Sequence, residues 1–540
     1  MIPLDRRQLL LGGAAGAAAF AAGCSGSDSR PPGPGASALP RVAPPQTLTL
    51  TTDVSGTGTY AYLPFDVPPG VARVQVAVRS SPPGAKLGAG LFDGRGTGYQ
   101  SAGFRGIYGE ERADFFVTAA TASQSFLPGP MDPGRWTVIV PVFLATQPAR
   151  VTATVTLTFG PATPVAASGA QVGVVLDQPG WYRGDLHCHT PESSDAWHSG
   201  TALAPADWAE HGRIEGLDFA ALTDHNVISQ NLALARDAGA DMLLMAGEEM
   251  TNWFDGHATV SGIAPGEWLD FRQTPEGQPL LQDGARIRDF FRTARDLGAY
   301  VSAAHPSFGP IAWRFKDEMV RPDSRPDGYE VWTGPFQNDD EQSVRDWDEM
   351  LRRGWRVHAN GGSDLHGTEN SYGFRFGTPT TVVYAPRLAQ ADVIAALRAG
   401  RSFVTRRPDG VECYLTGSLA GSRTYTGGTL TGPGSEKAEI EALVRGARGM
   451  RLILLTGAGP VSTTPITEDE QVVRASVAVP DYVRAEVRGT TRPGPPGKPL
   501  AFEADMESLT NPIWLIEGAP PSPVVDEVAP PGPKGPRRRR

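Results

Sequence analysis

The sequence predicts an α/β domain with a β-rich segment on each side. Between residues 181 and 407, short apolar runs alternate with amphipathic stretches, as strands and helices do when they follow one another. Both flanks instead carry short alternating segments divided by Pro/Gly turns, a pattern typical of β structure. All nine histidines lie between His187 and His366, inside the α/β part. A chain of 540 residues is too long for one hydrophobic core, so we expect about three domains.

Charge and cysteine content exclude some classes of function. The formal net charge is -10 and no internal basic stripe is present, so no nucleic-acid partner is expected, because phosphate binding needs a positive surface. Three cysteines do not make a disulfide framework. Cys188 and Cys413 could pair, but we expect two small buried apolar side chains.

Residues 1–24 predict an export signal. Arg6 and Arg7 precede a short apolar run, which is the twin-arginine pattern, and this run is too short and too rich in Gly and Ala to span a membrane. Small residues before Cys24 resemble a lipoprotein processing site, although ordinary cleavage without a lipid fits the same pattern. We expect twin-arginine export to a periplasmic or other extracytoplasmic location. A lipid on Cys24 would then attach the protein to the membrane surface, through a disordered linker over residues 25–45.

The two flanks predict β domains without a catalytic cluster. Residues 46–160 indicate a β-sandwich, for which a spacer or a surface-binding module is the favoured role. Residues 408–518 indicate a second β domain that closes with a strand over 510–516, and residues 519–540 indicate a disordered basic tail. The expected strands are Thr47–Thr52, Val74–Val78, Ala113–Thr118, Trp136–Val142, Arg150–Thr158, Glu412–Thr416, Ala438–Val444, Arg451–Leu455, Gln471–Val477 and Tyr482–Arg488.

The middle segment, residues 181–407, predicts parallel strands with helices outside them, either as a barrel or as a doubly wound sheet. The expected strands are Gly184–His189, Phe219–Thr223, Met242–Gly247, His257–Ile263, Tyr300–Ala304, Gly328–Trp332, Arg356–Gly361 and Thr380–Tyr384. The expected helices are Ala206–Glu210, Ser229–Ala238, Gly284–Leu297, Asp340–Arg353 and Gln390–Ala399.

Histidines and carboxylates follow the ends of these strands. His187 and His189 are two apart on a strand, so both imidazoles point to one side, and neutral imidazole is the commonest metal-binding side chain. A barrel would bring the strand ends around one mouth, where such barrels build their chemistry, so their placement favours the barrel. The other residues of this kind are Asp195, Asp224, His225, Glu248, Glu249, His257, His305, Asp364 and His366.

These motifs, taken in order, resemble the polymerase-and-histidinol-phosphatase (PHP) superfamily. The ordered set is His-x-His, Asp195, Thr-Asp-His, Gly-x-Glu, Gly-His, Ala-His-Pro and Asp-x-His. Tyr-Arg-Gly-Asp-Leu-His-Cys-His, Gly-Glu-Glu-Met-Thr and Leu-Arg-Ala-Gly-Arg-Ser resemble its CehA/McbA-type metallohydrolase branch. The resemblance covers roughly residues 181–407. It implies a distorted (β/α)7 barrel that holds two or three divalent metal ions, for which imidazole and carboxylate ligands suit Zn, Mn or Fe.

The resemblance also implies a role for each residue. His187, His189, Glu249 and Asp364 would bind a first metal; Glu249, His257 and His305 a second; and Asp195, His225 and His366 a third. Asp195 stands where relatives often carry a histidine, and His198 is the substitute candidate. The Gly-x-Glu register selects Glu249 over Glu248, and Asp224 is expected to orient a ligand histidine. Glu249, Asp364 and His305 are the predicted catalytic residues. Arg183, Arg314 and Arg375 are candidates for orienting a substrate anion, with a solvated surface position as the favoured role for each.

The expected function is an exported metal-dependent hydrolase of a small-molecule ester, with a phosphoester as first choice. In such a site, metal-activated water attacks the ester. One alternative is a carboxylic, aryl or carbamate ester, as in the CehA/McbA-type branch. Another is a non-catalytic surface binding protein in which the β segments carry the function.

Overall fold

The computed structural model describes residues 43–109, 114–161, 163–165, 169–193, 195–196, 200–368, 375–489, 492–493, 502–503, 505–523, 525–527 and 529–532. The unit considered below spans Pro44–Arg540. The predicted signal, Cys24, nearly all of the linker, His198 and the four terminal arginines lie outside the described residues. No helix in the described part of the chain is both long enough and apolar enough to cross a bilayer.

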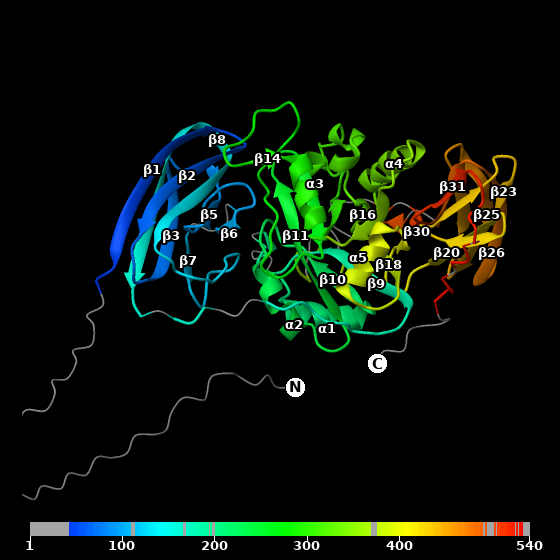
Figure 1. Cartoon of the computed structure of the whole chain (residues 1–540), viewed down its shortest axis with the longest axis horizontal. Helices are drawn as coiled ribbons and strands as arrows, with labels where there is room; N and C mark the ends of the chain where they lie inside the picture. The colour runs from blue at the N-terminus through cyan, green and yellow to red at the C-terminus, as the bar shows by residue number, and fades with distance from the viewer. Residues whose placement is uncertain are drawn as a thin grey trace, which may run out of the picture. The chain divides into compact units, whose positions relative to one another are not determined.

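The chain is mostly β, and its first strands share one long strand, β8 (Figure 1). β8 spans Gly134–Phe159 and includes two segments that the sequence predicted as separate strands. Its first half pairs with β2, β4 and β5, and its second half pairs with β1 and β3. Apolar side chains of both halves lie in one buried core. The other strands of this sheet are β1 (Gln46–Gly56), β2 (Thr59–Val67), β3 (Val71–Ser81), β4 (Lys86–Leu87), β5 (Ala89–Phe92), β6 (Phe104–Tyr108), which pairs with β5, and β7 (Asp114–Thr118), which pairs with β3.

The middle of the chain forms a curled sheet. The backbone N–H of Asp364, just after β17, donates to the carbonyl of His187 at 2.9 Å, and the N–H of His189 donates to Leu365 at 3.0 Å. The chain after β17 therefore lies beside the end of β9, although several strands separate them in the sheet order. That order is β17-β16-β15-β12-β11-β10-β9-β18, with bounds β9 (Gly180–Cys188), β10 (Phe219–Leu222), β11 (Leu243–Asn252), β12 (Gly256–Ser261), β15 (Tyr300–Ala303), β16 (Gly328–Thr333), β17 (His358–Gly362) and β18 (Thr380–Ala385).

Each expected helix forms, at least in part. In α3, Ile287, Phe290, Phe291 and Ala294 are buried at helical spacing, as the sequence predicted. The segment expected as one helix over 229–238 is instead a 3-10 turn, η2 (Ser229–Ala233), followed by a short α2. The helices are α1 (Pro205–Glu215), α2 (Leu234–Asp237), α3 (Ile287–Asp296), α4 (Asn338–Arg352) and α5 (Gln390–Arg398), with 3-10 turns η3 (Gly309–Ile311), η4 (Glu318–Val320) and η5 (Pro322–Ser324).

The expectation of parallel strands holds for only part of the sheet: β9, β10 and β11 run parallel, as do β15, β16 and β17. β12 runs antiparallel to both of its neighbours, β11 and β15, and β18 runs antiparallel to β9 and β19. Only residues 253–255 connect β11 to β12. Such a short turn can join antiparallel strands only, because a parallel pair needs a crossover of a dozen or more residues. A hairpin therefore joins β11 to β12, where the sequence predicted parallel strands.

The sheet continues past the boundary expected at residue 407. β19 (Ser402–Thr405) pairs with β30 (Met506–Thr510), so the C-terminal β segment extends the middle sheet. The single closing strand expected over 510–516 is two strands, because Asn511 and Pro512 separate β30 from β31 (Ile513–Glu517). The remaining strands are β13 (Gln273–Thr274), β14 (Ala285–Arg286), β20 (Glu412–Leu419), β21 (Ser422–Tyr425), β22 (Thr429–Gly432), β23 (Lys437–Arg445), β24 (Arg451–Thr456), β25 (Gly459–Pro465), β26 (Glu470–Ala478), β27 (Asp481–Arg488), β28 (Arg492–Pro493) and β29 (Phe502–Glu503).

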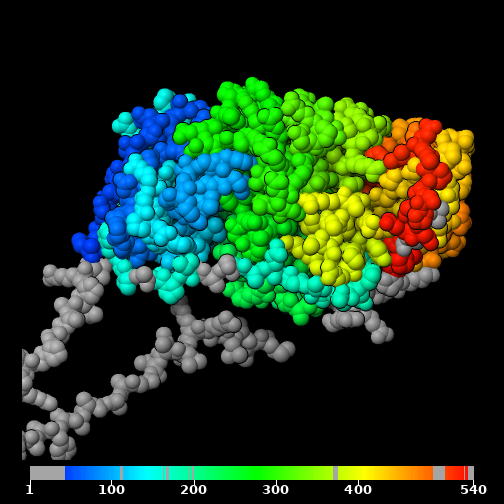
Figure 2. Space-filling view, viewed as in Figure 1, coloured from blue at the N-terminus to red at the C-terminus, as the bar shows by residue number. Residues whose placement is uncertain are grey.

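The N-terminal β region, residues 46–159, packs on the middle segment (Figure 2). Phe92, Phe104, Ile107 and Ile139 of this region belong to the same hydrophobic core as the middle strands. The Phe104 ring stacks on Trp268 with 4.0 Å between ring centroids. The two parts therefore share one buried interior. Cys188 and Cys413 are buried and unpaired, as predicted.

Candidate metal centre

The nine predicted ligand residues meet at one edge of the curled sheet. His187 lies in β9 and His189 directly after it, while the side chain of Cys188 between them is fully buried in the core. His305 lies two residues after β15 and Asp364 two residues after β17, and both share ligand groups with His187 of β9. The others lie in β11, in β12 and in the loops after β9, β10 and β17, and they are Glu249, His257, Asp195, His225 and His366.

Four overlapping groups of these side chains place their ligand atoms within 4.8 Å of one another. Each group could surround a single cation, and no other such group occurs among the described residues. The groups are His187, His189 and Asp364; His187, Glu249 and His305; His225, Glu249 and His257; and His189, Asp195, His225 and His366.

Glu249 is the centre of this arrangement. Its Oε1 lies 3.0 Å from His257 Nδ1 and 3.2 Å from His305 Nε2. Its Oε2 lies 2.7 Å from His225 Nδ1 and 3.5 Å from His187 Nε2. Its carboxylate is fully buried. One carboxylate therefore faces histidines on both of its oxygens, which is the position of a bridging ligand.

Asp364 joins the two histidines of the β9 motif. Its Oδ1 lies 3.3 Å from His187 Nε2 and 3.1 Å from His189 Nε2. Asp364 adopts a φ of 51° and His305 a φ of 28°, in the left-handed region that non-glycine residues rarely occupy. Such strained backbone is concentrated at functional sites.

Asp195 lies with two histidines on the solvent side of the cluster. Its Oδ2 lies 2.9 Å from His366 Nε2 and 3.1 Å from His225 Nε2. The ring of His366 stacks on His189 with 4.0 Å between centroids, so this group joins the first one. The third set of ligands predicted from the sequence, Asp195, His225 and His366, therefore forms one group, and His189 also belongs to that group.

Several buried atoms of the cluster have lone pairs and no hydrogen-bond partner. They include His187 Nε2 and Glu249 Oε2, which face each other 3.5 Å apart inside the cluster. A buried polar atom without a partner is costly, and a cation held between such atoms removes that cost. Imidazole nitrogens combined with carboxylate oxygens are the ligands that Zn, Mn and Fe accept. The residues present therefore fit divalent metal ions.

Charge inside the cluster follows from its composition. Burial raises the pKa of Glu249, but the neighbouring His225, His187 and His257 outweigh burial and hold that pKa well below its ordinary value. Burial, reinforced by His366 and His225, lowers the pKa of His189 to about 3. Glu249 is therefore ionised and His189 neutral at neutral pH. Burial lowers the pKa of His187 and His225, but neighbouring carboxylates outweigh burial and hold both pKa values well above the ordinary value, so a bound metal would displace protons from these two rings.

Two residues that the sequence reasoning did not select hold these ligands. The Glu330 carboxylate of β16 lies 3.2 Å from His187 Nδ1 and accepts from the N–H of His305 at 2.7 Å. The Ser193 hydroxyl lies 3.1 Å from His189 Nδ1 and accepts from the N–H of His225 at 3.2 Å. A glutamate inside an apolar predicted strand, Gly-Tyr-Glu-Val-Trp, was the available signal for Glu330. A buried carboxylate needs a partner, and here the partner is a histidine.

The role expected for Asp224 is wrong. Its carboxylate accepts from the Thr190 N–H and hydroxyl, each at 2.6 Å, and so fixes the loop after β9 instead of orienting a ligand histidine. Glu248 lies outside the metal groups, and its carboxylate accepts from the Leu269 N–H at 2.9 Å. The register that selected Glu249 over Glu248 therefore agrees with the geometry.

The arginines expected near a substrate anion are placed elsewhere or exposed. Arg183 pairs with Glu412 and donates to the carbonyl of Pro408 at 2.7 Å, in the C-terminal β segment. Arg314 and Arg375 are exposed. Arg183 is therefore a structural residue, and the expectation for it is wrong.

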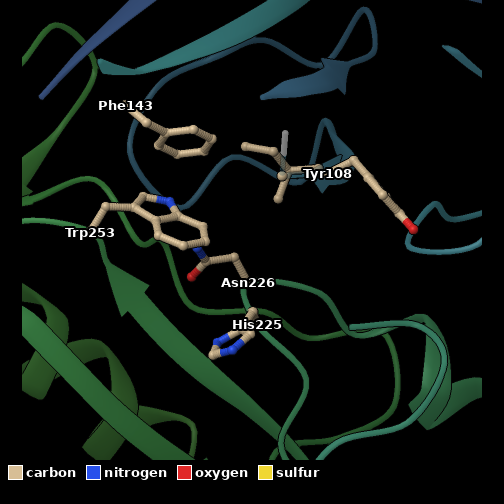
Figure 3. A pocket seen from close by; sticks show the side chains of 7 residues that line it. Tyr108, Phe143, His225, Asn226 and Trp253 are labelled. Carbon is tan, nitrogen blue, oxygen red and sulfur yellow. The ribbon is translucent and has the colours of Figure 1, made fainter. Parts of the chain in front are cut away.

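An aromatic pocket adjoins the cluster at His225 (Figure 3). Phe143 of β8 and Trp253 of the β11–β12 turn face each other there, with 4.6 Å between ring centroids and 61° between ring planes. The Trp253 ring lies 6.3 Å from the ring of His225 and 6.4 Å from that of His257. The pocket therefore opens beside two of the candidate ligands.

Comparisons with known proteins give little direct help. No protein-family model matches the chain, and no curated protein matches it. One similar solved structure is a two-domain protein from Bacteroides vulgatus described as containing a predicted PHP-like metal-dependent phosphoesterase. It has 16% identity and a TM-score of 0.34, covering 64% of this chain and 100% of that chain.

Another similar structure is an amidohydrolase from Chromobacterium violaceum with bound sulfate and no metal. It has 18% identity and a TM-score of 0.27, covering 42% of this chain and 98% of that chain. The geometry of the cluster carries the inference about function.

Proposed function

We propose that this protein is a metal-dependent hydrolase whose nine clustered residues hold two or three divalent cations. One observation carries this proposal: the ligand atoms of nine His, Asp and Glu side chains form four overlapping groups, within 4.8 Å of one another in each, and the Glu249 carboxylate lies among four of the histidines. The strand order and the ordered motifs support a distorted (β/α)7 barrel of the PHP type, with one unit replaced by the β11–β12 hairpin. They also support membership of the CehA/McbA-type branch.

The residues of the first and third proposed cation sites fall within single ligand groups, and Glu249 Oε1 contacts both histidines of the second. His187, His189 and Asp364 would hold one cation, His257 and His305 a second, and Asp195, His225 and His366 a third, with Glu249 between them. Bound divalent cations lower the pKa of a water molecule and stabilise negative charge that develops on oxygen.

The protein's own residues prepare this site. Glu249, Asp364 and His305 are the proposed catalytic residues, and the negative charges of Glu249 and Asp364 would offset part of the metal charge. Glu330 fixes the ring of His187 by its contact with Nδ1, which leaves Nε2 directed toward Asp364 and Glu249. Thr251 Oγ1 lies 2.6 Å from His225 Nδ1 and restrains that ring in the same way. A ligand set held in this way loses little freedom when it binds.

The proposed substrate is a small-molecule ester. The ordered motifs favour a phosphoester, because they resemble the PHP superfamily. A carboxylic, aryl or carbamate ester is the second candidate, and two observations favour it. Arg183 forms an ion pair with Glu412. The described residues that line the pocket beside His225 include no arginine or lysine that would attract a phosphate.

Esterase activity of the metal-loaded protein tests the proposal. The panel is nitrophenyl phosphate, bis-nitrophenyl phosphate and nitrophenyl acetate, with the Glu249→Ala and Glu248→Gln variants assayed in parallel. We expect turnover of at least one ester, loss of metal and activity together in Glu249→Ala, and retention of both in Glu248→Gln, because Glu248 lies outside the ligand groups.

The panel also separates the alternatives. Turnover of nitrophenyl acetate alone would reject the phosphoester and support the second candidate. No turnover of any ester by protein that carries its metals would favour a non-catalytic binding protein.

Two further proposals rest on the sequence. They are the domain limits, 46–160, 181–407 and 408–518, and twin-arginine export with a lipid on Cys24. Fractionation of cells that express Cys24→Ser checks the lipid, because the variant should leave the membrane fraction.

A further inference from the structure

The N-terminal β region contributes a wall to the pocket beside the metal cluster. Phe143 and Tyr108 come from β8 and β6 of that region, whereas Trp253, Asn226 and His225 come from the curled sheet and its loops. Figure 3 shows the rings of Phe143 and Trp253 facing each other, with His225 below them. Both aromatic side chains are only half-buried, so ring surface remains accessible.

The lining of this pocket is uncharged apart from the imidazole of His225. None of the described lining residues is an aspartate, glutamate, lysine or arginine. The amide of Asn226 is already used, because it donates to the Thr251 carbonyl at 2.9 Å and accepts from the Thr251 N–H at 2.7 Å. The hydroxyl of Tyr108 points away from the pocket (Figure 3). A charged or sugar-like group would find few partners here, whereas an apolar group would find the accessible ring surface of Phe143 and Trp253.

The N-terminal β region is fastened where it meets the site. The N–H of Ser125 donates to Glu192 at 2.6 Å, and the Ser229 hydroxyl donates to the same carboxylate at 2.7 Å. Glu192 belongs to the loop that carries Ser193 and Asp195. The guanidinium of Arg272, fully buried, donates to the Tyr62 hydroxyl and to the Thr97 carbonyl, each at 2.9 Å. These contacts tie the N-terminal β region, which carries Phe143, to the segment that carries Trp253.

We propose that Phe143 and Trp253 form a specificity wall that receives an uncharged, apolar substituent of the substrate while the reacting ester lies at the metal cluster. The proposal rests on the proposed hydrolase function and adds to it the kind of substrate taken. It also gives the N-terminal β region a role in recognition in place of a spacer. Both residues are specificity residues and take no part in bond cleavage.

Binding of two phosphonates, which cannot be hydrolysed at phosphorus, tests this wall without turnover. Phenylphosphonate carries the ring and methylphosphonate lacks it, and both present the same charged head to the metals. Titration calorimetry with metal-loaded protein gives both affinities for the wild type and for Phe143→Ala, Trp253→Leu and Phe254→Ala. Phe254 is the matched control, because it lies beside Gly58 at the same contact between the two regions and does not line the pocket.

We expect Phe143→Ala and Trp253→Leu each to weaken phenylphosphonate binding about tenfold, as loss of an aromatic contact implies, and to change methylphosphonate binding less than about twofold. Phe254→Ala should leave the ratio of the two affinities unchanged. Equal effects on both phosphonates, or no effect on either, in variants with wild-type metal content would overturn the proposal.

The same variants distinguish failure of the specificity-wall proposal from failure of the proposed hydrolase function. If the wild type hydrolyses no ester, the proposed reaction is wrong, and the affinity ratios still decide whether the wall exists. If it hydrolyses phenyl and ethyl esters of one acid, Phe143→Ala should lower kcat/KM for the phenyl ester about tenfold more than for the ethyl ester, mainly through KM. Equal losses for both esters would overturn the wall and leave the hydrolase in place.

Discussion

At the scale of single residues, Glu330 restrains two ligands at once. Its carboxylate contacts Nδ1 of His187 and the backbone N–H of His305, and it is almost completely buried. The backbone of His305 is in the left-handed region, so the bond from its N–H helps to hold a conformation that a histidine rarely adopts. Glu330 therefore fixes the ring of one ligand and the backbone of another.

We predict that Glu330→Gln weakens metal binding by about 10- to 100-fold, because the partner of a ligand histidine sets its orientation and basicity. Competition with a chromophoric chelator measures the change. Glu248→Gln is the control: this carboxylate is equally buried, lies at a neighbouring position to Glu249 and touches no candidate ligand. Wild-type affinity in Glu330→Gln would show that the contact with His187 has no role in the centre.

At the scale of elements, the β11–β12 hairpin sets the central part of the site. Its register places Glu249 opposite Thr259 and His257 opposite Thr251, so Glu249 and His257 are diagonal neighbours on one face. Their Oε1 and Nδ1 atoms are 3.0 Å apart as a result. A shift of this register by one residue would turn the side chain of Glu249 or of His257 to the opposite face of the sheet, because successive side chains of a strand point to opposite faces.

Gly362, the last residue of β17, packs closely against His187 and Glu330. A Cβ on Gly362 would lie 2.4 Å from His187 Cβ and 2.8 Å from Glu330 Oε1. We predict that Gly362→Ala destabilises the protein by about 1–3 kcal/mol through overpacking and lowers its metal content. Thermal unfolding and elemental analysis check both effects. Gly173→Ala is the control, since no atom lies within 4 Å of the added Cβ, and similar behaviour of the two variants would contradict the prediction.

Local sequence patterns predicted where strands and helices lie better than they predicted which strands pair and in which direction. The strand that ends in His187 and His189 and the apolar face of α3 were predicted, because both follow from side-chain periodicity over a few residues. The antiparallel direction of β12 was missed, because a strand buried on both faces has the same apolar pattern in either direction. The pairing of β19 with β30 joins residues about 100 positions apart, and nothing in either strand alone specifies it.

The site residues show the same division. His187, Glu249, His305 and Asp364 stand in recognisable motifs at strand ends, and the structure brings them together. Glu330 stands in no motif, and its importance depends on a contact with a strand 143 positions earlier in the sequence. Arg183 stands inside a motif, but its side chain leaves the site for Glu412. Which way a side chain points at the first residues of a strand depends on the packing around it.

At the scale of the whole molecule, the α/β segment shares its interior with the N-terminal β region. Arg272 and Asp270 form a fully buried ion pair at this contact, with 2.9 Å between Arg272 Nε and Asp270 Oδ1. Gln100, from the N-terminal region, donates its N–H to the same Asp270 at 3.1 Å. Polar groups from both parts thus satisfy one buried charge pair, which ties the wall of the pocket to the site.

We predict that Arg272→Ala destabilises the protein by about 3–5 kcal/mol, because it leaves the Asp270 charge buried without its partner. Chemical unfolding followed by fluorescence measures this change. The control is Arg150→Ala, which removes an arginine of the same N-terminal region from an exposed pair with Asp53 and should leave unfolding close to wild type. Equal stability of Arg272→Ala and the wild type would show that this contact does not hold the two parts together.

The metal content of purified protein tests the central claim most directly. Elemental analysis of protein that was never unfolded or exposed to a chelator gives the number of divalent ions per chain. We predict at least two ions in the wild type and fewer than one in Glu249→Ala, since Glu249 lies between the proposed cations. Fewer than one ion per chain in the wild type, or the same content in both proteins, would contradict a metal centre built around Glu249.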